Sequence, residues 1–211
     1  MLYQSPKRFA FSILYGKITL NSRYGGSMKT KELLAESFRE LALSMPFQKI
    51  SIKMITDKAG VIRPTFYNYF QDKYEVIEFL YEKDIQNNIQ VMLDNDMDTE
   101  AIKLMFICFE KNRKYYKTML AVTGQNSFEE FFDHRLEDTF LFILKKHPMR
   151  QLPSSLITPE MLAHFNAMIL IEMVKLWLSD STEVSAEEMY EAYCFFLKTS
   201  VLDMIQYPPV P

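Results

Sequence analysis

The stretch "RPTFYNYFQDK", residues 63–73, decides the fold of the N-terminal part of this chain. Proline is tolerated in the first turn of a helix, so Pro64 indicates a helix start rather than a break. At about 100° per residue, Phe66 and Phe70 share one helix face and Asn68 points directly away from it. We therefore predict a short amphipathic helix. Its outer face carries Thr, Asn and Tyr side chains, which suit contacts with phosphates and base edges.

Two segments before this stretch also have helical patterns. "TKELLAESFRELALS", residues 30–44, has one apolar stripe, and Pro46 ends it. "SIKMITDKAG", residues 51–60, predicts a short helix with Ser51 as the N-cap and Gly60 at the C-terminal end. Two short helices joined by a tight turn that contains glycine form a helix-turn-helix, in which the second helix reads DNA.

The rest of the chain predicts helices alone. Asp72 and Lys73 open a long helix over about 73–93, and the polar segment "DNDMDTE" (94–100) follows it. Further amphipathic helices are expected near 99–111, 113–122, 127–147, 159–179 and 185–205. Their starts carry capping signals in Ser127 with Glu130, Ser185 with Glu188, and Thr158 before Pro159. With only five glycines in 211 residues, we predict an all-α fold.

The net charge of −3 hides an asymmetry along the chain. Residues 1–27 hold four basic and no acidic residues, and residues 28–73 hold eight basic and five acidic ones. The remainder is therefore strongly acidic, so the front of the chain favours a polyanionic partner. The alternative is an ordinary set of solvated helix faces.

Several classes of function find no support in the sequence. The two cysteines, Cys108 and Cys194, have neither disulfide nor zinc spacing, which indicates a reducing, cytoplasmic setting. The three histidines form no ligand pair of recognised spacing, so we expect no metal and no cofactor. No phosphate loop, nucleophile elbow or catalytic carboxylate pair is present, and we expect no enzyme activity. No transmembrane helix is predicted, because the most apolar run is short and carries Glu172 and Lys175.

The last two predicted helices carry apolar residues over unusually broad faces. We interpret them as a dimer interface, a four-helix bundle built from two hairpins, and the alternative is a hairpin buried in a monomer. The predicted interface residues are Phe165, Ile169, Met173, Trp177, Tyr193, Phe196, Leu197, Val201 and Met204.

"KISIKMITDKAGVIRPTFYNYFQDKYEVIEFLYEKD", residues 49–84, resembles the DNA-binding domain of the TetR family of bacterial transcriptional regulators. The resemblance rests on the order of Ala59-Gly60-Val61, Thr65-Phe66-Tyr67, Phe70 and Lys73. "FEKNRKYYKTMLAVTGQNSFEEFF", residues 109–132, is similar to a Firmicutes-type subgroup of that family which includes activators of dihydroxyacetone kinase operons. The family implies a helix-turn-helix domain over 28–73 and a helical effector-binding and dimerisation domain over 74–211.

The resemblance also implies a set of DNA-binding residues. Four would lie in the major groove, two at the entry of the reading helix, one on a phosphate after it, and two would make lesser backbone contacts. In that order they are Thr65, Tyr67, Asn68 and Tyr69, then Arg63 and Pro64, then Lys73, then Ser51 and Thr56. Many relatives carry Ser or Thr where this chain has Ile62, which removes a usual N-cap, so Ile62 is not counted among them.

Residues 1–27 have no counterpart in the family. Gly25 and Gly26 can be encoded by a ribosome-binding sequence just before Met28, so we expect Met28 to be the natural start and 1–27 a translated leader. The alternative is a basic arm that enters the minor groove. Deleting 1–27 separates the two, because operator affinity falls markedly only if the segment is an arm.

Aromatic and methionine side chains around "NRKYYKTML" suit a cavity for a moderately apolar small molecule. The candidate effector contacts are Tyr115, Tyr116, Met119, Phe128, Phe131 and Phe132. We therefore predict a homodimeric regulator that binds a palindromic double-stranded DNA operator and is released by an effector. Two alternatives remain, namely control by a protein partner and a helical interaction protein that does not bind DNA.

Overall fold

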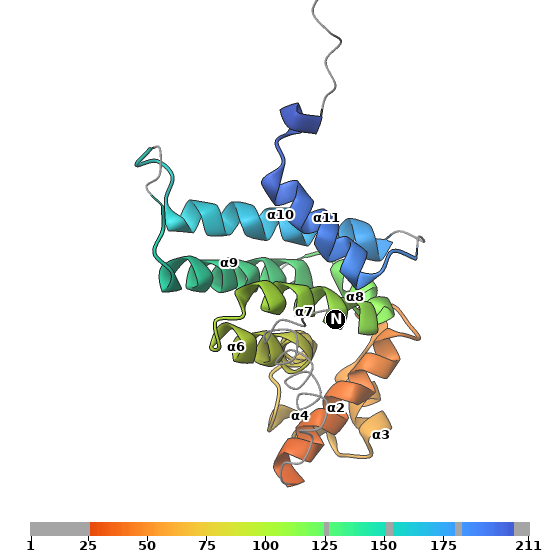
Figure 1. The fold of residues 1–211 in the computed structure, drawn as a ribbon. Helices are drawn as coiled ribbons and strands as arrows, with labels where there is room; N and C mark the ends of the chain where they lie inside the picture. Colours follow the sequence, from red (N-terminus) through yellow and green to blue (C-terminus); the bar gives the residue numbers. More distant parts are fainter. Residues whose placement is uncertain (1–25, 125–126, 151–153, 180–182, 205–211) are drawn as a thin grey trace, which may run out of the picture.

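The computed structural model describes residues 26–124, 127–150, 154–179 and 183–204, and within these ranges it is helical with no strand (Figure 1). The predicted all-α fold is therefore confirmed. Residues 1–25, which make up nearly all of the expected leader or arm, lie outside the described residues.

The N-terminal unit contains α2 (Gly26–Ala42), the 3-10 turn η1 (Phe47–Lys49), α3 (Ile52–Ala59) and α4 (Arg63–Tyr67). The apolar stripe of α2 lies inside, where Leu34 and Phe38 are fully buried. Phe47, from η1, packs edge-on against Phe38 with ring centroids 6.2 Å apart. The three helices thus share one small core.

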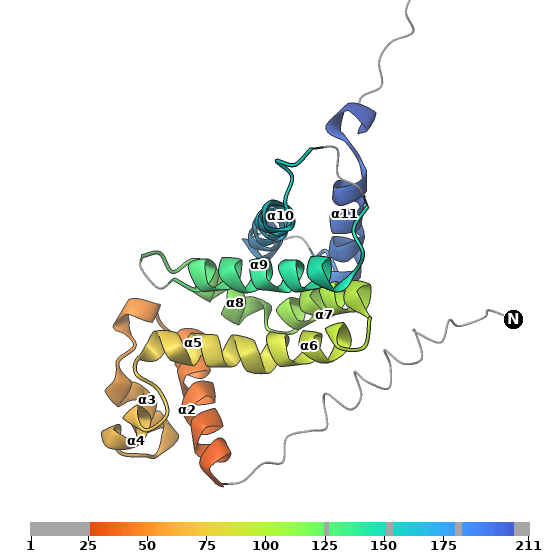
Figure 2. The same ribbon diagram turned by 90° about the vertical axis from the view of Figure 1, so that its left-hand side faces the viewer.

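One continuous rod leads out of this unit. It consists of α5 (Lys73–Tyr81), the π-helical segment η2 (Glu82–Gln86) and α6 (Asn87–Leu93), and Figure 2 shows it running from the N-terminal unit beneath the later helices. The predicted helix over 73–93 matches the extent of this rod. The π-helical turn in its middle was not predicted.

The later helices are α7 (Asp98–Lys111), α8 (Arg113–Leu120), α9 (Phe128–Lys146), α10 (Pro159–Ser179) and α11 (Ala186–Lys198), followed by the 3-10 turn η3 (Val201–Met204). The last helix ends earlier than predicted, because the backbone becomes extended at Thr199. At Ser185 the full capping box with Glu188 forms, and Ser127 and Thr158 accept the N–H groups of Glu130 and Met161.

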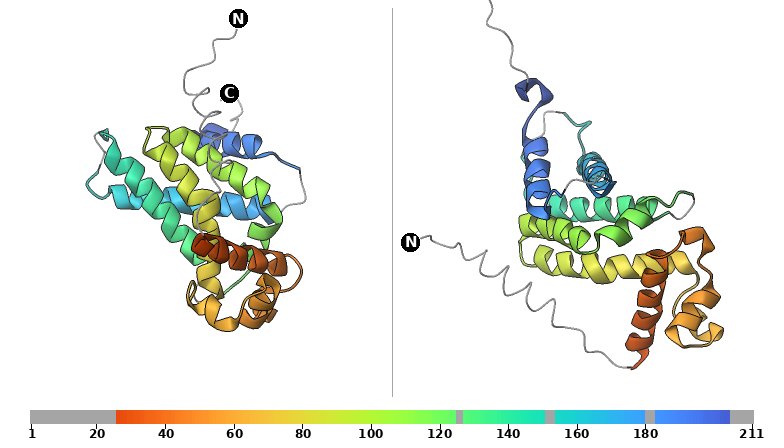
Figure 3. Two further views of the ribbon diagram at one scale, coloured as in Figure 1. Left: turned by 90° about the horizontal axis from the view of Figure 1, so that it is seen from below. Right: turned by 90° about the vertical axis from the view of Figure 1, so that its right-hand side faces the viewer.

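These helices form layers above the rod. α7, α8 and α9 lie over it, α10 runs along α9, and α11 lies against α7 (Figures 2 and 3). Rings of Tyr81, Phe109, Phe128 and Phe132 fill the space between the rod and α7–α9, and the Phe128 and Phe132 rings stack 5.7 Å apart.

By length and composition, α10 is apolar enough to cross a membrane, with a mean hydropathy of 1.4 over its best window, 39% of which is buried. The sequence prediction overlooked this, because it considered only the central part of the helix. Core helices of soluble proteins have the same character, and here Ala163, Leu170 and Val174 of α10 are buried.

Candidate DNA-binding interface

The turn between α3 and α4 is set by two capping residues. The Ser51 hydroxyl accepts the Met54 N–H at 3.3 Å and so caps α3. Gly60 ends this helix in the left-handed region, at φ 68°, where a side chain would be strained. The N–H of Val61 then bonds the Thr56 carbonyl at 3.0 Å. Both predicted caps are present, and they direct the chain into α4.

α4 is anchored by its phenylalanines and exposes its polar side chains. Phe66 and Phe70 are buried, and their rings lie 5.6 Å apart. Arg63, Pro64, Tyr67 and Asn68 are exposed, whereas Thr65 and Tyr69 are half-buried. The faces are those that the helical period predicts.

Arg63 and Tyr67 stand together on this outer face. The Arg63 Nη2 donates to the Tyr67 hydroxyl at 3.1 Å, and its guanidinium lies 5.7 Å from the Tyr67 ring centroid. The two side chains are one turn apart, so each restricts the rotamers of the other. A guanidinium held in this way keeps donors available for a phosphate or a guanine edge.

Ile62 occupies the N-cap position of α4 and makes no capping hydrogen bond. Its side chain is 70% exposed. As expected from the sequence, α4 has no polar side-chain cap at this position. The backbone carbonyl of Ile62 accepts the Thr65 N–H at 2.9 Å.

Thr56 does not fit the role that the family resemblance implied. Its side chain is buried, and its hydroxyl donates back to the carbonyls of Ile52 and Lys53 at 3.1 and 3.0 Å. A hydroxyl that is satisfied inside its own helix cannot reach a DNA phosphate. Thr56 is thus a core residue of the helix-turn-helix.

Lys73 has a structural role that the sequence did not reveal. Its ammonium donates to the carbonyls of Phe47 and Ile50 at 2.8 and 3.1 Å and lies 4.0 Å from the Phe47 ring centroid. Burial lowers the pKa of Lys73. An ammonium has three donors, so one N–H remains for a phosphate.

The predicted dimer residues divide into two groups. Phe165, Phe196, Leu197 and Met204 are exposed, and Ile169 and Met173 are half-buried. The side chain of Val201 lies outside the described part of the chain.

Trp177 and Tyr193 belong instead to the core of the single chain. Both rings pack on Phe106, with centroids 6.0 and 5.8 Å away, and the indole N–H of Trp177 donates to the Val184 carbonyl at 2.8 Å. Their burial removes them from the candidate interface. Three exposed neighbours, Met168, Leu176 and Phe195, extend the apolar surface instead.

The rings of five of the six candidate effector contacts form one connected group in the fold. Phe128, Phe131 and Phe132 pack on Tyr81, and Tyr116 packs on Tyr115 and Phe128. Met119 is also buried, and of the six only Phe131 is half-buried. A cavity of about 380 Å³ lies instead between the N-terminal part of α9 and α10. It is lined by Ser127, Glu129, Glu130, Asp133, Met168, Ile171 and Glu172, none of which was predicted.

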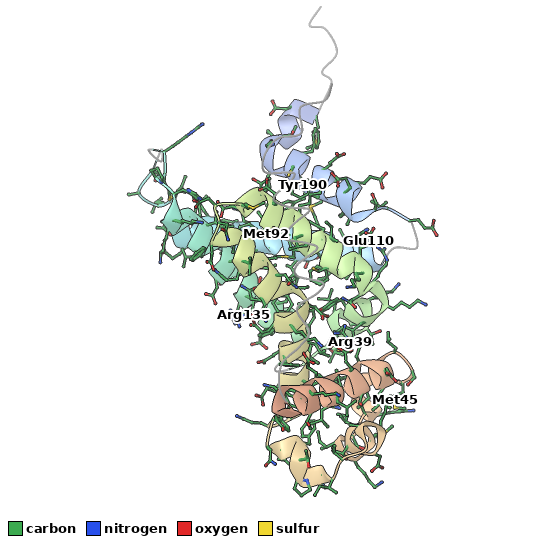
Figure 4. The ribbon with its side chains drawn as sticks, turned by 60° about the horizontal axis from the view of Figure 1, so that its bottom comes forward. Arg39, Met45, Met92, Glu110, Arg135 and Tyr190 are labelled. Atoms are coloured by element: carbon green, nitrogen blue, oxygen red, sulfur yellow. The ribbon has the colours of Figure 1, made fainter. Side chains whose placement is uncertain are left out.

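A polar junction between the N-terminal unit and the later helices was also not predicted. Arg39 of α2 pairs with Asp84 of η2 at 2.8 Å, and the Tyr116 hydroxyl donates to the same carboxylate at 3.0 Å. Figure 4 shows Arg39 where α2 meets the helices above it. The sequence pattern that could have predicted this junction is weak. It consists of Arg39 and Asp84, each a single charged residue beside the apolar positions of its helix.

Comparison with known proteins adds a family model and several relatives. Residues 96–198 match the TetR-type model described as a transcriptional regulator C-terminal region. Over 106 residues the chain is 28% identical to the dhaKLM operon transcriptional activator DhaS of Lactococcus lactis subsp. lactis, a match that covers 50% of this chain and only 56% of that relative.

Solved structures share the fold. A TetR transcriptional regulator from Streptococcus agalactiae has a TM-score of 0.62 at 22% identity, over 81% of this chain and 94% of its own. Thermus thermophilus FadR, a TetR-family repressor solved in complex with lauroyl-CoA, has a TM-score of 0.57 at 18% identity, over 86% and 98% of the two chains. These relatives are transcriptional regulators rather than enzymes. Family match, relatives and helix-turn-helix geometry agree, and the chain belongs to the TetR family of transcriptional regulators.

Proposed function

We propose that this regulator binds a palindromic DNA operator as a homodimer, with α4 of each copy in the major groove. The observation that carries the proposal is the outer face of α4. Its side chains offer hydrogen-bond donors and acceptors, residues 61–70 contain no carboxylate, and the buried Phe66 and Phe70 hold the helix in place. Arg63, Tyr67 and Asn68 are the exposed groups best placed to read base edges and phosphates.

The exposed apolar surface of α10 and α11 supports the homodimer. Phe165, Met168 and Leu176 on α10 and Phe195, Phe196 and Leu197 on α11 are all more than 40% exposed. Exposed large apolar side chains gathered on two helices are typical of an interface between subunits. A two-fold dimer presents two reading helices to half-sites about 34 Å apart.

The proposed effector is a small molecule that binds among the aromatic rings between the rod and α7–α9. Its support is the pair of buried hydroxyls of Tyr81 and Tyr115, for which the described residues supply no hydrogen-bond partner. A buried polar group without a partner calls for a ligand or a water. Binding there requires the packed rings of Phe128 and Phe132 to separate.

In a second candidate mechanism, a protein partner rather than a small molecule controls the regulator. A pull-down that finds a stoichiometric partner, together with native mass spectrometry that finds no bound small molecule, would favour this mechanism.

The test of DNA binding uses fluorescent duplexes of the sequences that genome-wide mapping finds bound. The region upstream of the chain's own gene is tested as well. We expect binding whose affinity falls steeply with salt, because phosphate contacts release counterions. A shuffled duplex of equal length is the control. Absence of salt-sensitive binding to any mapped sequence would contradict the proposal.

A further inference from the structure

Three consecutive side chains of η2 pair between them with three neighbouring helices, α2, α8 and α9. Glu82 pairs with Arg135 of α9. Lys83 lies 3.2 Å from Glu36 of α2, and Asp84 pairs with α2 and α8 together. The pairs meet in the one π-helical turn of the rod, and such turns occur frequently at functional sites.

Asp84 is the centre of this arrangement. One of its oxygens, Oδ2, accepts both the Arg39 guanidinium and the Tyr116 hydroxyl, at 2.8 and 3.0 Å. The side chains of Arg39 and Asp84 are only 11% and 14% exposed. The guanidinium also donates to Glu36 and Asn112, at 2.9 and 3.3 Å. A single carboxylate oxygen thus joins α2 of the N-terminal unit to α8.

The physical character of the cluster favours positioning over stability. Burial lowers the pKa of Arg39, but the carboxylates of Asp84 and Glu36 outweigh burial and raise it. The guanidinium therefore stays charged and must stay paired. Apolar residues of the same volume often give equal or greater stability than a buried ion pair, whereas separating the partners is strongly unfavourable. Such a cluster permits few orientations of one unit relative to the other.

We propose that Asp84 and Tyr116 are positioning residues, which hold the helix-turn-helix in its DNA-reading orientation through Arg39. Movement of α8 that withdraws the Tyr116 hydroxyl leaves the Asp84 carboxylate with one partner fewer, and α2 then becomes free to change its angle to the rod. Tyr116 lies among the aromatic rings proposed to receive the effector. An effector bound there would therefore act on the same hydroxyl that helps to hold the orientation of the helix-turn-helix. The inference rests on the proposed function for the meaning of the reading orientation.

The chain supplies a matched pair of variants to test this role. Tyr116→Phe removes a hydroxyl that bonds to Asp84, whereas Tyr193→Phe removes a buried hydroxyl that has no partner among the described residues. The Tyr193 ring packs on Phe106 and is not one of the proposed effector contacts, so the control removes the same atom from a buried ring without touching the cluster. Asp84→Asn, which keeps the shape of the side chain, is a second variant if Tyr116→Phe does not fold.

The first readout is a distance within one chain. Spin labels are placed at Lys53→Cys on α3 and Lys145→Cys on α9, both exposed, in a Cys194→Ser background. Cys108 can stay, because burial raises the pKa of its thiol to about 12 and protects it from labelling. An excess of unlabelled protein confines the measured pairs to single chains. The second readout is affinity for the mapped operator, with melting temperature as the check on folding.

We expect Tyr116→Phe to broaden or shift the distance distribution and to weaken operator binding about tenfold, the usual effect of losing a hydrogen bond to a charged group. Tyr193→Phe should leave both readouts as in the wild type. Equal distance distributions for the two variants would overturn the inference, whatever their affinities. If no chain binds DNA at all, the proposed function fails, and the distance measurement still decides the role of Tyr116.

Discussion

At the scale of single residues, the side chains available for DNA are those that are not buried in the core. Phe66 and Phe70 are buried, and the buried Thr56 hydroxyl bonds to a carbonyl of its own helix. Arg63 and Tyr67 are paired with each other and otherwise face solvent. A residue whose side chain is exposed can be changed for its effect on DNA binding alone, whereas a change at Lys73 also affects the fold.

Tyr67→Ala should weaken operator binding about tenfold or more, because it removes a base-edge or phosphate contact and releases Arg63. Tyr67 is 49% exposed, so the melting temperature should stay close to that of the wild type. Fluorescence anisotropy and thermal denaturation measure the two effects. Tyr67→Phe, which removes only the hydroxyl, is the control and should give an intermediate affinity. A large loss of stability in Tyr67→Ala would instead show that the residue belongs to the core.

Lys73→Ala should lower both stability and operator affinity. Losing the ammonium removes its bond to the Ile50 carbonyl and one of the two donors of the Phe47 carbonyl, which keeps the Ile50 N–H, and this costs about 1–3 kcal/mol. If the remaining N–H also holds a phosphate, the slope of log affinity against log salt falls by about one. Denaturant unfolding and a salt titration report the two roles separately. A variant that keeps its stability but loses the slope would assign Lys73 to DNA alone.

At the scale of elements, local sequence decides where helices begin and end. Ser51, Gly60 and Ser185 each act through backbone groups within a few residues, so their roles were predictable. The outward face of α4 was predictable for the same reason, since it follows from the helical period. The π-helical turn, the carbonyl contacts of Lys73 and the pairing of Arg39 with Asp84 join residues that are far apart or depend on packing, and no local pattern encodes them.

Gly60→Ala tests the turn between α3 and α4. A Cβ at this position would meet no atom within 4 Å, so the whole penalty comes from the left-handed backbone. That penalty is about 1–2 kcal/mol, and urea unfolding should show it as a lower midpoint with an unchanged slope. Gly60→Asn should lose less, because asparagine tolerates this conformation better. Equal losses for Ala and Asn would contradict the assignment of the penalty to the left-handed backbone.

At the scale of the whole molecule, the proposed dimer depends on the exposed apolar side chains of α10 and α11. Both helices bury one side in their own chain and leave the other side to solvent. This division explains why too many interface residues were predicted from the sequence. The apolar period of a helix marks both sides alike, and only the packing of Trp177 and Tyr193 on Phe106 separates them.

Phe196→Glu should convert the dimer to a monomer, since it places a charge in the middle of the proposed interface. Phe196 is 55% exposed in the single chain, so the secondary structure should not change. Sedimentation velocity measures the mass, and operator binding should fall with it, because one reading head contacts only one half-site. Leu156→Glu, at an 81% exposed position before α10, is the control and should leave the mass unchanged. A monomeric wild type, or a variant that remains dimeric, would contradict this interface.

The π-helical turn of the rod also determines how the chain tolerates a change in length. A π-helical turn closes i to i+5 rather than i to i+4, so it holds one residue more than an α-helical turn. We expect a single deletion within Glu82–Gln86 to convert this turn into an α-helical one and to leave the azimuth of the helix-turn-helix around the rod nearly unchanged. A deletion within α5 or α6 would instead rotate the helix-turn-helix by roughly 100°. In the proposed dimer, the place of a deletion along the rod would therefore decide whether the two copies of α4 keep their spacing.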